Sequence, residues 1–477
     1  MIAEAARREL IDAVGPKSLL DREEDLRLYE FDGSVDKARP DVVVFPRSAS
    51  EVAAIARIAA KHDLPVVGRG AGTGLSGGAV PRHGGIMVGF SRMNRILELD
   101  FENERAVVEP GVVNLELTNA AAPSGYFFAP DPSSQRACTI GGNVAENAGG
   151  PHTLVYGVTT NHVLDLEAVL PDGRVLHTGA LHADPAGYDL NGLLTGSEGT
   201  LALVTKITVR LMKKPEAVKT FLAIYDSVDD CAATVSEITA RAITPAALEM
   251  LDGTLLRMVE EATHAGYPLD AAGVLLIELE GLTEAVEDQA EQIRLACEAC
   301  NAREFRVARS AQERDLLWKG RKNAFGAIGR VSPFFYVHDG MVPRSRIPAT
   351  LRRIQEISSA CGLTISNIFH AGDGNMHPII LFDARKPGDM EKAQRAGFDI
   401  LEYCVSVGGA ITGEHGIGME KLDLMSKQFN EETLDLMRRL KRIFDPAQLF
   451  NPGKLLPTGK GCTEIRQPPI ARPEDLL

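Results

Sequence analysis

The sequence predicts an α+β protein with more than one domain, and three observations lead to this prediction. The 477 residues exceed what one hydrophobic core usually supports, so two or three domains are expected. Hydrophobic residues make up 44% of the chain and charged residues 24%, which is the composition of an ordinary soluble globular protein. From Asp41 onward, short apolar runs typical of strands alternate with the periodicity of amphipathic helices.

Short β-α-β-like units are expected between residues 41 and 212, which we assign to a first domain. Ser48 and Glu51 form a capping-box pattern, in which a hydroxyl and a carboxylate accept hydrogen bonds from backbone amides at the start of a helix. The predicted strands of this region are Val42–Phe45, Leu64–Val67, Ile86–Val88, Ala106–Val108, Leu166–Leu170 and Leu201–Leu211.

Lys213-Lys214-Pro215 marks the end of the first domain, because proline cannot continue a β-ladder. A second domain is expected at 215–430, followed by a C-terminal segment at 431–455 that returns to the first domain and a mobile polar tail at 456–477. Residues 1–40 are expected to form a charged helical segment. The predicted elements of the second domain are the strands Val274–Glu280, Ile365–Phe369 and Ile379–Phe382 and the helices Thr283–Ala299 and Ile347–Cys361.

Charge, hydropathy and cysteine usage exclude several function classes. The 51 Lys and Arg residues against 65 Asp and Glu leave a net charge of −14 with no basic block, which argues against nucleic acid or an anionic membrane as the main partner. The best apolar stretch, around Ala271–Leu279, is too short to span a membrane, and Met1–Leu10 lacks the apolar region of a signal peptide. Seven widely spaced cysteines fit a reducing compartment, so we expect a cytoplasmic protein. Cys297 and Cys300 lie in a helical pattern with no further cysteine nearby, which favours a buried helix face over a zinc or iron–sulfur site.

A glycine-dense loop at residues 68–78 indicates a possible anion site. It holds six glycines in eleven residues, and a backbone without Cβ atoms can bring several N–H groups onto one anion. The loop formally contains the G-x-G-x-x-G fingerprint of Rossmann folds, but that fingerprint requires a helix directly after the loop. Pro81 and the strand expected at Ile86–Val88 leave no room for such a helix. Two interpretations remain: a pyrophosphate cradle made of loop amides, and a glycine-rich turn without a ligand.

Two further loops rich in small polar residues favour the first interpretation. Residues 130–150 and 196–200 repeat glycine, serine and asparagine, which lets a large polar ligand approach the backbone closely. Three such loops on an α+β frame suit an extended dinucleotide better than a nucleoside triphosphate. The sequence also contains no G-x-x-x-x-G-K-[ST] pattern.

A histidine-flanked turn predicts a metal site. His370 and His377 enclose a Gly-Asp-Gly turn between two predicted strands, so their imidazoles can face one point. Glu414 and His415 lie between glycines and add a carboxylate and a third imidazole. Two neutral imidazoles and one carboxylate make a three-ligand set with open positions. The alternatives are that each histidine is satisfied by its own hydrogen bond, and that the cluster only ties down a loop.

These motifs, in this order, resemble the FAD-binding domain of the vanillyl-alcohol oxidase/PCMH superfamily. More narrowly, the chain from about Asp41 to Lys454 is similar to the FAD-binding catalytic subunits of bacterial glycolate oxidases and their D-lactate dehydrogenase relatives, in the D-2-hydroxy-acid dehydrogenase group. The resemblance implies a PCMH-type FAD-binding domain of two α+β subdomains and a cap domain with a ferredoxin-like antiparallel sheet and helices. Many superfamily members attach FAD through a histidine in or near the first glycine loop, and loop 68–78 has none, so the resemblance implies non-covalent FAD. The motifs that carry it are Arg69–Gly78, Ala129–Gly150, Gly196–Gly199, Phe369–His377, Gly413–Gly418 and Asn451–Lys454.

The resemblance also implies roles for individual residues. Positions matching His370, His377 and Glu414 hold a divalent cation, zinc or manganese, and His415 matches the proposed base. Arg321 matches the arginine that binds the substrate carboxylate, a task suited to a planar bidentate donor. Asn375 is expected to support the turn and to contact the substrate. The expected FAD-binding residues are Arg69, Gly70, Ala71, Gly72, Thr73, Gly74, Leu75, Ser76, Gly77, Pro130, Asp131, Ser134, Gly141, Gly142, Asn143, Asn147, Gly149, Gly150, Glu198, Gly199 and Asn451.

The implied reaction is the FAD-dependent oxidation of a small 2-hydroxy acid, glycolate to glyoxylate or D-lactate to pyruvate, by metal-assisted hydride transfer to flavin. Relatives that act on 2-hydroxyglutarate carry a lysine in a Tyr-Lys-Tyr-Asp stretch. This chain has Tyr336-Val337-His338-Asp339 instead, which favours a small substrate. The alternatives are a stand-alone D-lactate or other D-2-hydroxy-acid dehydrogenase and a non-catalytic subunit with an FAD fold.

A separate electron acceptor is expected, because the sequence has no iron–sulfur cysteine pattern and no C-x-x-C-H haem motif. The resemblance implies a second FAD-type subunit and an iron–sulfur subunit, linked to quinone at the inner face of the plasma membrane. Direct reaction of the reduced flavin with oxygen is the alternative.

Overall fold

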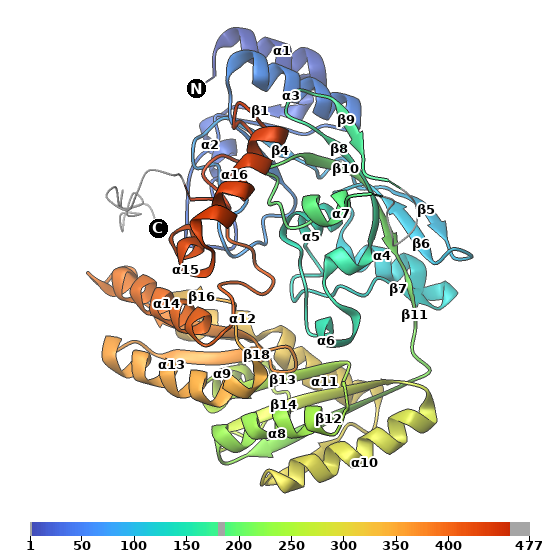
Figure 1. The fold of residues 1–477 in the computed structure, drawn as a ribbon, viewed down its shortest axis with the longest axis vertical. Helices are drawn as coiled ribbons and strands as arrows, with labels where there is room; N and C mark the ends of the chain where they lie inside the picture. The colour runs from blue at the N-terminus through green and yellow to red at the C-terminus, as the bar shows by residue number, and fades with distance from the viewer. Residues whose placement is uncertain (1, 180–186, 458–477) are drawn as a thin grey trace. The chain divides into compact units, whose positions relative to one another are not determined.

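The computed structural model describes residues 2–179 and 187–457, and its contacts group the chain into two compact units (Figure 1). Unit 1 takes in the residues up to Gly149, Val158–Lys214 and the segment from Glu414, whereas unit 2 takes in Gly150–Gly157 and Pro215–Gly413. The expected division at 213–215 recurs here, but residues 150–157 join unit 2 and residues 414–430 join unit 1. Both segments are loops or short helices whose sequence has no long periodic pattern. The tail expected at 456–477 lies, from residue 458, outside the described residues.

The first sheet of unit 1 is formed by β1 (Leu19–Leu20), β2 (Val42–Val44), β4 (Ile86–Gly89) and β3 (Val66–Arg69), in this order. β2 and β3 both pair with β4 in parallel, whereas β1 is antiparallel to β2. Helices α1 (Glu4–Val14) and α3 (Ala49–His62) lie side by side in Figure 1 and share one apolar core with this sheet. The charged N-terminal segment is therefore only partly helical, because it also supplies β1.

Helix α3 begins where the capping pattern predicts. Ser48 Oγ accepts a hydrogen bond from the amide of Glu51 at 3.3 Å. The Glu51 carboxylate accepts one from the amide of Arg47 at 2.8 Å, one residue before the position that a capping box would use. The loop between β3 and β4, which the structure describes throughout, contains no helix, as the sequence predicts. This excludes the Rossmann interpretation of the glycine fingerprint.

The second sheet of unit 1 is antiparallel, with strand order β5-β6-β10-β8-β9. Its strands are β5 (Ile96–Asp100), β6 (Arg105–Val108), β8 (Val163–Val169), β9 (Val175–His177) and β10 (Leu203–Arg210). Helices α4 (Asn114–Ala121), α5 (Ile140–Glu146) and α7 (Leu190–Leu194) contribute buried side chains to the core of this sheet. A short pair, β7 (Tyr126–Phe127) and β11 (Met212–Lys213), completes unit 1 before the chain enters unit 2.

The C-terminal segment returns to the first sheet of unit 1. After α15 (Met425–Gln428) and α16 (Glu431–Phe444), Phe450 forms a parallel bridge with Val66 on β3, and its side chain is fully buried. The carboxylate of Asp445 accepts hydrogen bonds from the amides of Leu449 and Phe450, at 3.1 Å and 2.8 Å. These contacts fix the residues that precede Asn451.

Unit 2 is built on an antiparallel sheet with strand order β15-β12-β14-β13-β18-β19-β16, and β17 pairs with β19 beside β16. The order β15-β12-β14-β13, with β12 first along the chain, is that of a ferredoxin-like sheet, which confirms the expected cap architecture. The strands are β12 (Ala217–Tyr225), β13 (Ala247–Asp252), β14 (Gly273–Gly281), β15 (Glu304–Val307), β16 (Phe334–Val337), β17 (Gly340–Met341), β18 (Ile365–His370) and β19 (Asn375–Phe382).

Helices of unit 2 alternate with its strands. The helices are α6 (Thr153–Tyr156), α8 (Val228–Ala240), α9 (Gly253–Thr263), α10 (Thr283–Ala299), α11 (Ala311–Lys322), α12 (Ala324–Val331), α13 (Ile347–Cys361) and α14 (Asp389–Ser406). Helix α11 directs Arg314, Trp318 and Arg321, which lie on one helical face, towards carboxylates of β13 and β14. Among the described helices, none is long and apolar enough to cross a membrane.

Candidate active site

The hairpin of β18 and β19 brings His370 and His377 together, as the turn pattern predicts. Asp373 Oδ1 accepts a hydrogen bond from the amide of Asn375 at 2.9 Å, which closes the turn. Gly374 has φ +84°, and a Cβ atom there would lie 2.1 Å from the carbonyl oxygen of Val342, so the turn requires glycine at this position.

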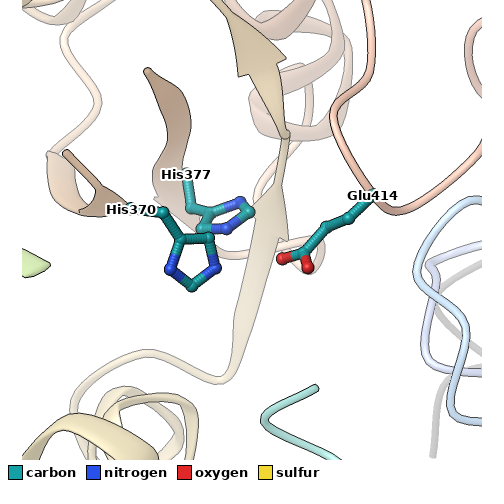
Figure 2. A group of neighbouring side chains, drawn as sticks. All are labelled: His370, His377 and Glu414. Atoms are coloured by element: carbon teal, nitrogen blue, oxygen red, sulfur yellow. The ribbon is translucent and has the colours of Figure 1, made fainter. Parts of the chain in front are cut away.

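The two imidazoles lie on one face of the sheet. His370 is paired with Asn375 across the hairpin, and His377 follows Asn375 by two residues on β19. The ring centroids are 5.0 Å apart and the ring planes are nearly perpendicular, at 89°. Figure 2 shows the two rings next to each other, and both side chains are buried.

Both histidines use Nδ1 for a hydrogen bond to an acceptor in unit 2. His370 Nδ1 lies 2.7 Å from Glu249 Oε1, and His377 Nδ1 lies 3.4 Å from the carbonyl oxygen of His338. An acceptor at Nδ1 places the ring proton there and leaves the lone pair on Nε2. Metal-ligating histidines adopt this arrangement, and the metal site stays a prediction.

Glu414 completes a three-ligand group. Ligand atoms of His370, His377 and Glu414 all lie within 4.8 Å of one another, and Figure 2 shows the carboxylate pointing towards the two rings. Glu414 directly follows Gly413, whose amide donates to Asp339 Oδ2 at 2.9 Å in unit 2. Two imidazole nitrogens and one carboxylate oxygen are ligands that suit the predicted zinc or manganese ion.

Arg321 lies beside this group rather than in solvent. Its side chain is 2% exposed, and its Nε donates to Glu249 Oε2 at 2.5 Å. Complete burial acts to raise the pKa of Glu249, but the charges of Arg321 and His370 outweigh it and lower that pKa. Glu249 is thus an ionised link between the predicted metal ligand and the predicted substrate arginine.

Glu249 is the residue that sequence reasoning missed. It stands in the apolar run Ala247-Leu-Glu-Met-Leu251, which was not recognised as a strand. Acidic residues are almost never fully buried unless they are paired, so a lone glutamate in such a run was the available signal.

Asn375 remains a candidate for substrate contact. Its side chain is 3% exposed and lies against the backbone of Gly413, where a Cβ atom would come within 2.5 Å of Asn375 Cγ. Asn375 Oδ1 has no hydrogen-bond partner among the described residues. A buried amide oxygen without a partner, directly across the hairpin from His370, suits contact with a polar ligand.

The segment that carries His415 is held within unit 1 by side chains from two glycine loops. Ser76 Oγ donates to the carbonyl oxygen of His415 at 3.0 Å. The Glu198 carboxylate accepts hydrogen bonds from the amides of Ile417 and Gly418, at 2.7 Å and 2.8 Å. Burial raises the pKa of Glu198 despite these two bonds. His415 Nε2 lies 3.8 Å from Glu414 Oε1, so adjacent residues supply a candidate base and a candidate ligand.

The three predicted glycine loops converge in unit 1. A Cβ atom on Gly70 would lie 2.4 Å from Thr139 Oγ1, so the first loop packs directly on the second. The amides of Gly196 and Glu198 both donate, at 2.8 Å, to carbonyl oxygens of α5, which joins the third loop to the second. Asn451 Nδ2 donates to the carbonyl oxygens of Gly78 and Glu198, at 2.9 Å and 2.7 Å, and so joins the first loop to the third.

Several side chains expected to bind FAD also hold these loops in place. Arg69 donates to the carbonyl oxygen of Phe31 at 2.7 Å, and Asn143 Oδ1 accepts from Asn114 Nδ2 at 2.9 Å. Asn147 Oδ1 accepts from the amide of Thr160 at 2.9 Å. Ser76, Glu198 and Asn451 make the contacts described above.

The backbone of the loops also leaves space for the cofactor. A Cβ atom on Gly74 or Gly199 would meet nothing within 4 Å, so open space borders the chain at both glycines. Open backbone on convergent glycine loops is what an extended dinucleotide requires. The residues present therefore fit FAD.

Two protein families match the chain. The family of FAD binding domains matches residues 40–179, and the family of FAD linked oxidases, C-terminal domain, matches residues 214–455, more than half of the chain. The chain belongs to the FAD-linked oxidases. As an FAD-linked oxidase it is an FAD-dependent oxidoreductase, which confirms the predicted enzyme class and flavin cofactor.

Curated relatives place this FAD-linked oxidase near the group that the sequence resembles. It is 46% identical to the glycolate oxidase subunit GlcD of Escherichia coli K12, over 94% of this chain and 90% of that one. Identity to the Bacillus subtilis glycolate oxidase subunit GlcD is 41%, over 95% of this chain and 97% of the relative. A mitochondrial D-lactate dehydrogenase [cytochrome] of Arabidopsis thaliana is 34% identical, over 88% of this chain and 74% of the relative. The resemblance drawn from the motifs is thereby confirmed.

Solved structures confirm the predicted fold class. p-Cresol methylhydroxylase has a TM-score of 0.82 at 18% identity and covers 95% of this chain and 97% of its own. The 4-ethylphenol oxidase of Gulosibacter chungangensis has a TM-score of 0.79 at 20% identity, over 96% and 98% of the two chains. At such low identity the likeness concerns the fold alone.

Proposed function

We propose that this FAD-linked oxidase oxidises a small 2-hydroxy acid, glycolate or D-lactate, to the corresponding 2-oxo acid as the catalytic subunit of a glycolate-oxidising complex. The observation that carries the proposal is the group of His370, His377 and Glu414 with both imidazole Nδ1 atoms engaged, next to the buried Arg321–Glu249 pair. The 46% identity of the chain to a glycolate oxidase subunit supports the choice of substrate class.

Each residue then has a defined task. When bound, FAD would supply the electron acceptor, and a zinc or manganese ion would supply the positive charge that polarises the substrate oxygens. His370, His377 and Glu414 would hold the ion, and Arg321 would bind the substrate carboxylate through its Nη donors. His415 would accept the hydroxyl proton on a ring nitrogen, and Ser76 and Glu198 would hold its segment in place.

Val337 supports a small substrate. It lies opposite Ile379 in the pairing of β16 with β19, so its side chain is on the same sheet face as His377. Relatives that act on 2-hydroxyglutarate carry a lysine at the matching position of the Tyr-x-x-Asp stretch. A buried valine offers no charge for a second carboxylate, so dicarboxylates should bind weakly.

Electrons would leave through partner subunits. The six described cysteines are free thiols, of which Cys138, Cys231, Cys297 and Cys404 are buried. Among the described residues, neither group of three potential metal ligands includes a cysteine. The GlcD relatives are named as subunits, which supports a complex with other subunits. We propose that these are a second FAD-type subunit and an iron–sulfur subunit, linked to quinone at the inner membrane face. The second candidate is a stand-alone D-lactate dehydrogenase, which the named plant relative supports.

Anaerobic flavin bleaching tests the proposal. Purified holoenzyme should lose its flavin absorbance with glycolate or D-lactate, and should respond weakly to L-lactate and D-2-hydroxyglutarate. Removal of the metal with a chelator should abolish bleaching, and zinc or manganese should restore it. Full bleaching by a metal-free preparation would contradict the metal, and no bleaching by any of the four acids would contradict the substrate class.

A further inference from the structure

Glu249 lies at the centre of the candidate site although none of the predicted motifs contains it. Its side chain is fully buried on β13. Oε1 pairs with His370 Nδ1 at 2.7 Å, and Oε2 accepts from Arg321 Nε at 2.5 Å. Each carboxylate oxygen is therefore committed to one of two groups, the predicted metal ligand and the predicted substrate arginine.

Strand register accounts for this placement. Glu249 is directly opposite His370 in the pairing of β13 with β18, and His370 is directly opposite Asn375 in the pairing of β18 with β19. Helix α11 brings Arg321 to the same carboxylate. The three side chains are thus fixed by regular secondary structure, which holds a site more closely than loops do.

The bond to Nδ1 determines what His370 can do. A carboxylate that accepts the Nδ1 proton keeps the lone pair on Nε2, stops the ring from turning and makes Nε2 a better ligand. The bond to Nε of Arg321 likewise fixes the guanidinium plane, while the Nη atoms carry the other four N–H donors. A guanidinium fixed in this way can still bind a carboxylate as a fork.

We propose that Glu249 is a positioning residue that sets both the metal affinity of His370 and the orientation of Arg321 towards the substrate carboxylate. The inference rests on the proposed function, since it assumes that His370 is a ligand and that Arg321 binds substrate. Beyond that function, we infer that the single carboxylate of Glu249 links His370 to Arg321, so that one substitution weakens metal binding and substrate binding together.

A matched control lies on the neighbouring strand. Glu278 on β14 is also fully buried, and it also pairs with one histidine, His152, and one arginine, Arg314. Loss of its charge disturbs a buried ion pair in the same sheet without touching His370 or Arg321. Glu278→Gln therefore reports what a merely structural role of a buried carboxylate would produce.

Metal affinity of the substrate-free protein is the first readout. Protein that retains FAD but has been stripped of metal is titrated with Mn²⁺ or Zn²⁺ against a chelating indicator. Glu249→Gln should weaken binding by 10- to 100-fold, the usual effect of losing such a partner, because the amide cannot accept from both neighbours. Glu249→Asp, which keeps the charge but shortens the side chain, should recover part of the affinity. Glu278→Gln should bind the ion as the parent does.

Steady-state kinetics at saturating metal gives the second readout. Glu249→Gln should raise the KM for glycolate by at least tenfold, because the fork of Arg321 is no longer fixed, whereas Glu278→Gln should leave KM unchanged. Metal affinity and KM within threefold of the parent in Glu249→Gln would overturn the proposal, as would equal losses in Glu278→Gln. If Glu249→Gln does not fold, unaltered affinity and KM in Glu249→Asp would overturn it. A parent protein that binds no ion would overturn the proposed function itself, which separates that failure from this one.

Discussion

Two buried glutamates on adjacent strands of the unit 2 sheet each hold one histidine and one arginine, yet their contacts suit the two clusters to different roles. Glu249 pairs with His370 and Arg321, and Glu278 pairs with His152 and Arg314. Glu278 lies two residues along β14 from the position opposite Glu249, so both carboxylates are on the same face of the sheet. The residue types and the burial of the two carboxylates are the same, but Arg314 is 35% exposed and Arg321 only 2%. The contacts of the two clusters differ as well.

The first difference is the ring nitrogen that each histidine uses. His370 meets Glu249 through Nδ1 at 2.7 Å, whereas His152 meets Glu278 through Nε2 at 3.2 Å. The second difference is saturation of the carboxylate. Arg314 donates to both oxygens of Glu278, at 2.8 Å and 2.7 Å, and Trp318 Nε1 donates to Oε2 at 2.7 Å.

Proximity alone does not make the Glu278 cluster a metal site. Ligand atoms of His152, Glu278 and Glu280 lie within 4.8 Å of one another, as do those of His370, His377 and Glu414. Arg314, however, places a positive charge where a cation would bind, and Tyr156 donates to Glu280 Oε2 at 2.7 Å. The Glu278 cluster instead attaches residues 150–157 to the sheet, which explains why this segment belongs to unit 2. The ring nitrogen that faces each glutamate and the donors around each carboxylate, rather than the residue types, distinguish the two clusters.

Removal of one histidine from each cluster should produce the largest contrast. His377→Ala should lower the rate of flavin reduction by glycolate about 10³-fold, since a metal supplies several kcal/mol of charge stabilisation in the transition state. His152→Ala should leave that rate within a fewfold of the parent and reduce thermal stability. Stopped-flow reduction and metal analysis on both variants provide the measurement. A similar rate loss in the two variants would remove the distinction between the clusters.

The free energy of unfolding should rank the two clusters in the reverse order, with the larger loss at the Glu278 cluster. Glu278→Gln removes the partner of Arg314 and His152 inside the sheet, and breaking such a buried pair costs about 3 kcal/mol of unfolding free energy. Urea unfolding of the apo-protein measures the change, and FAD and metal content should match the parent. A stability loss below about 1 kcal/mol would show that the Glu278 cluster does not hold residues 150–157 in place.

Much of the fold was accessible from sequence because its signals are local. The helices Thr283–Ala299 and Ile347–Cys361 have the predicted bounds, and the Gly-Asp-Gly turn places His370 beside His377 as expected. The glycine loops also converge as a dinucleotide cradle requires. Periodicity, turn residues and glycine content are read over a few neighbouring positions, and each of these predictions needed nothing more.

The remaining contacts depend on strand order, which the sequence does not encode locally. Glu249 meets His370 because β13 lies next to β18, although 121 positions separate them along the chain. Arg321 taken alone resembles a solvated charge on a helix, and it is buried only because that carboxylate lies beneath α11. Ser76 and Glu198 are predicted to bind FAD, and their side chains also hold the His415 segment across more than 200 residues of sequence. Such long-range pairings require the tertiary structure.

His415 offers a further contrast, because the described residues of the Glu278 cluster include no comparable base next to a ligand. The effect of replacing it should be smaller than that of losing the metal. His415→Ala should lower turnover about 100-fold, the usual contribution of a general base, with metal and FAD content unchanged. Turnover equal to that of the parent would exclude His415 as the base and would leave only the ligand set to define the site.

The pH dependence of stability gives the smallest and most specific contrast. Burial acts to raise the pKa of Glu278, but hydrogen bonds and charge from His152 and Arg314 lower it well below its ordinary value of 4.5. A carboxyl with a lowered pKa in the folded state stabilises that state fully above the unfolded pKa, and this contribution fades as the pH falls below about 4.5. The stability difference between the parent and Glu278→Gln should therefore be constant near neutral pH and shrink as the pH falls from about 5 to 3. Urea midpoints of both proteins across this range measure it, and a difference that stays constant down to about pH 3 would mean that Glu278 is not held as an anion by its two partners.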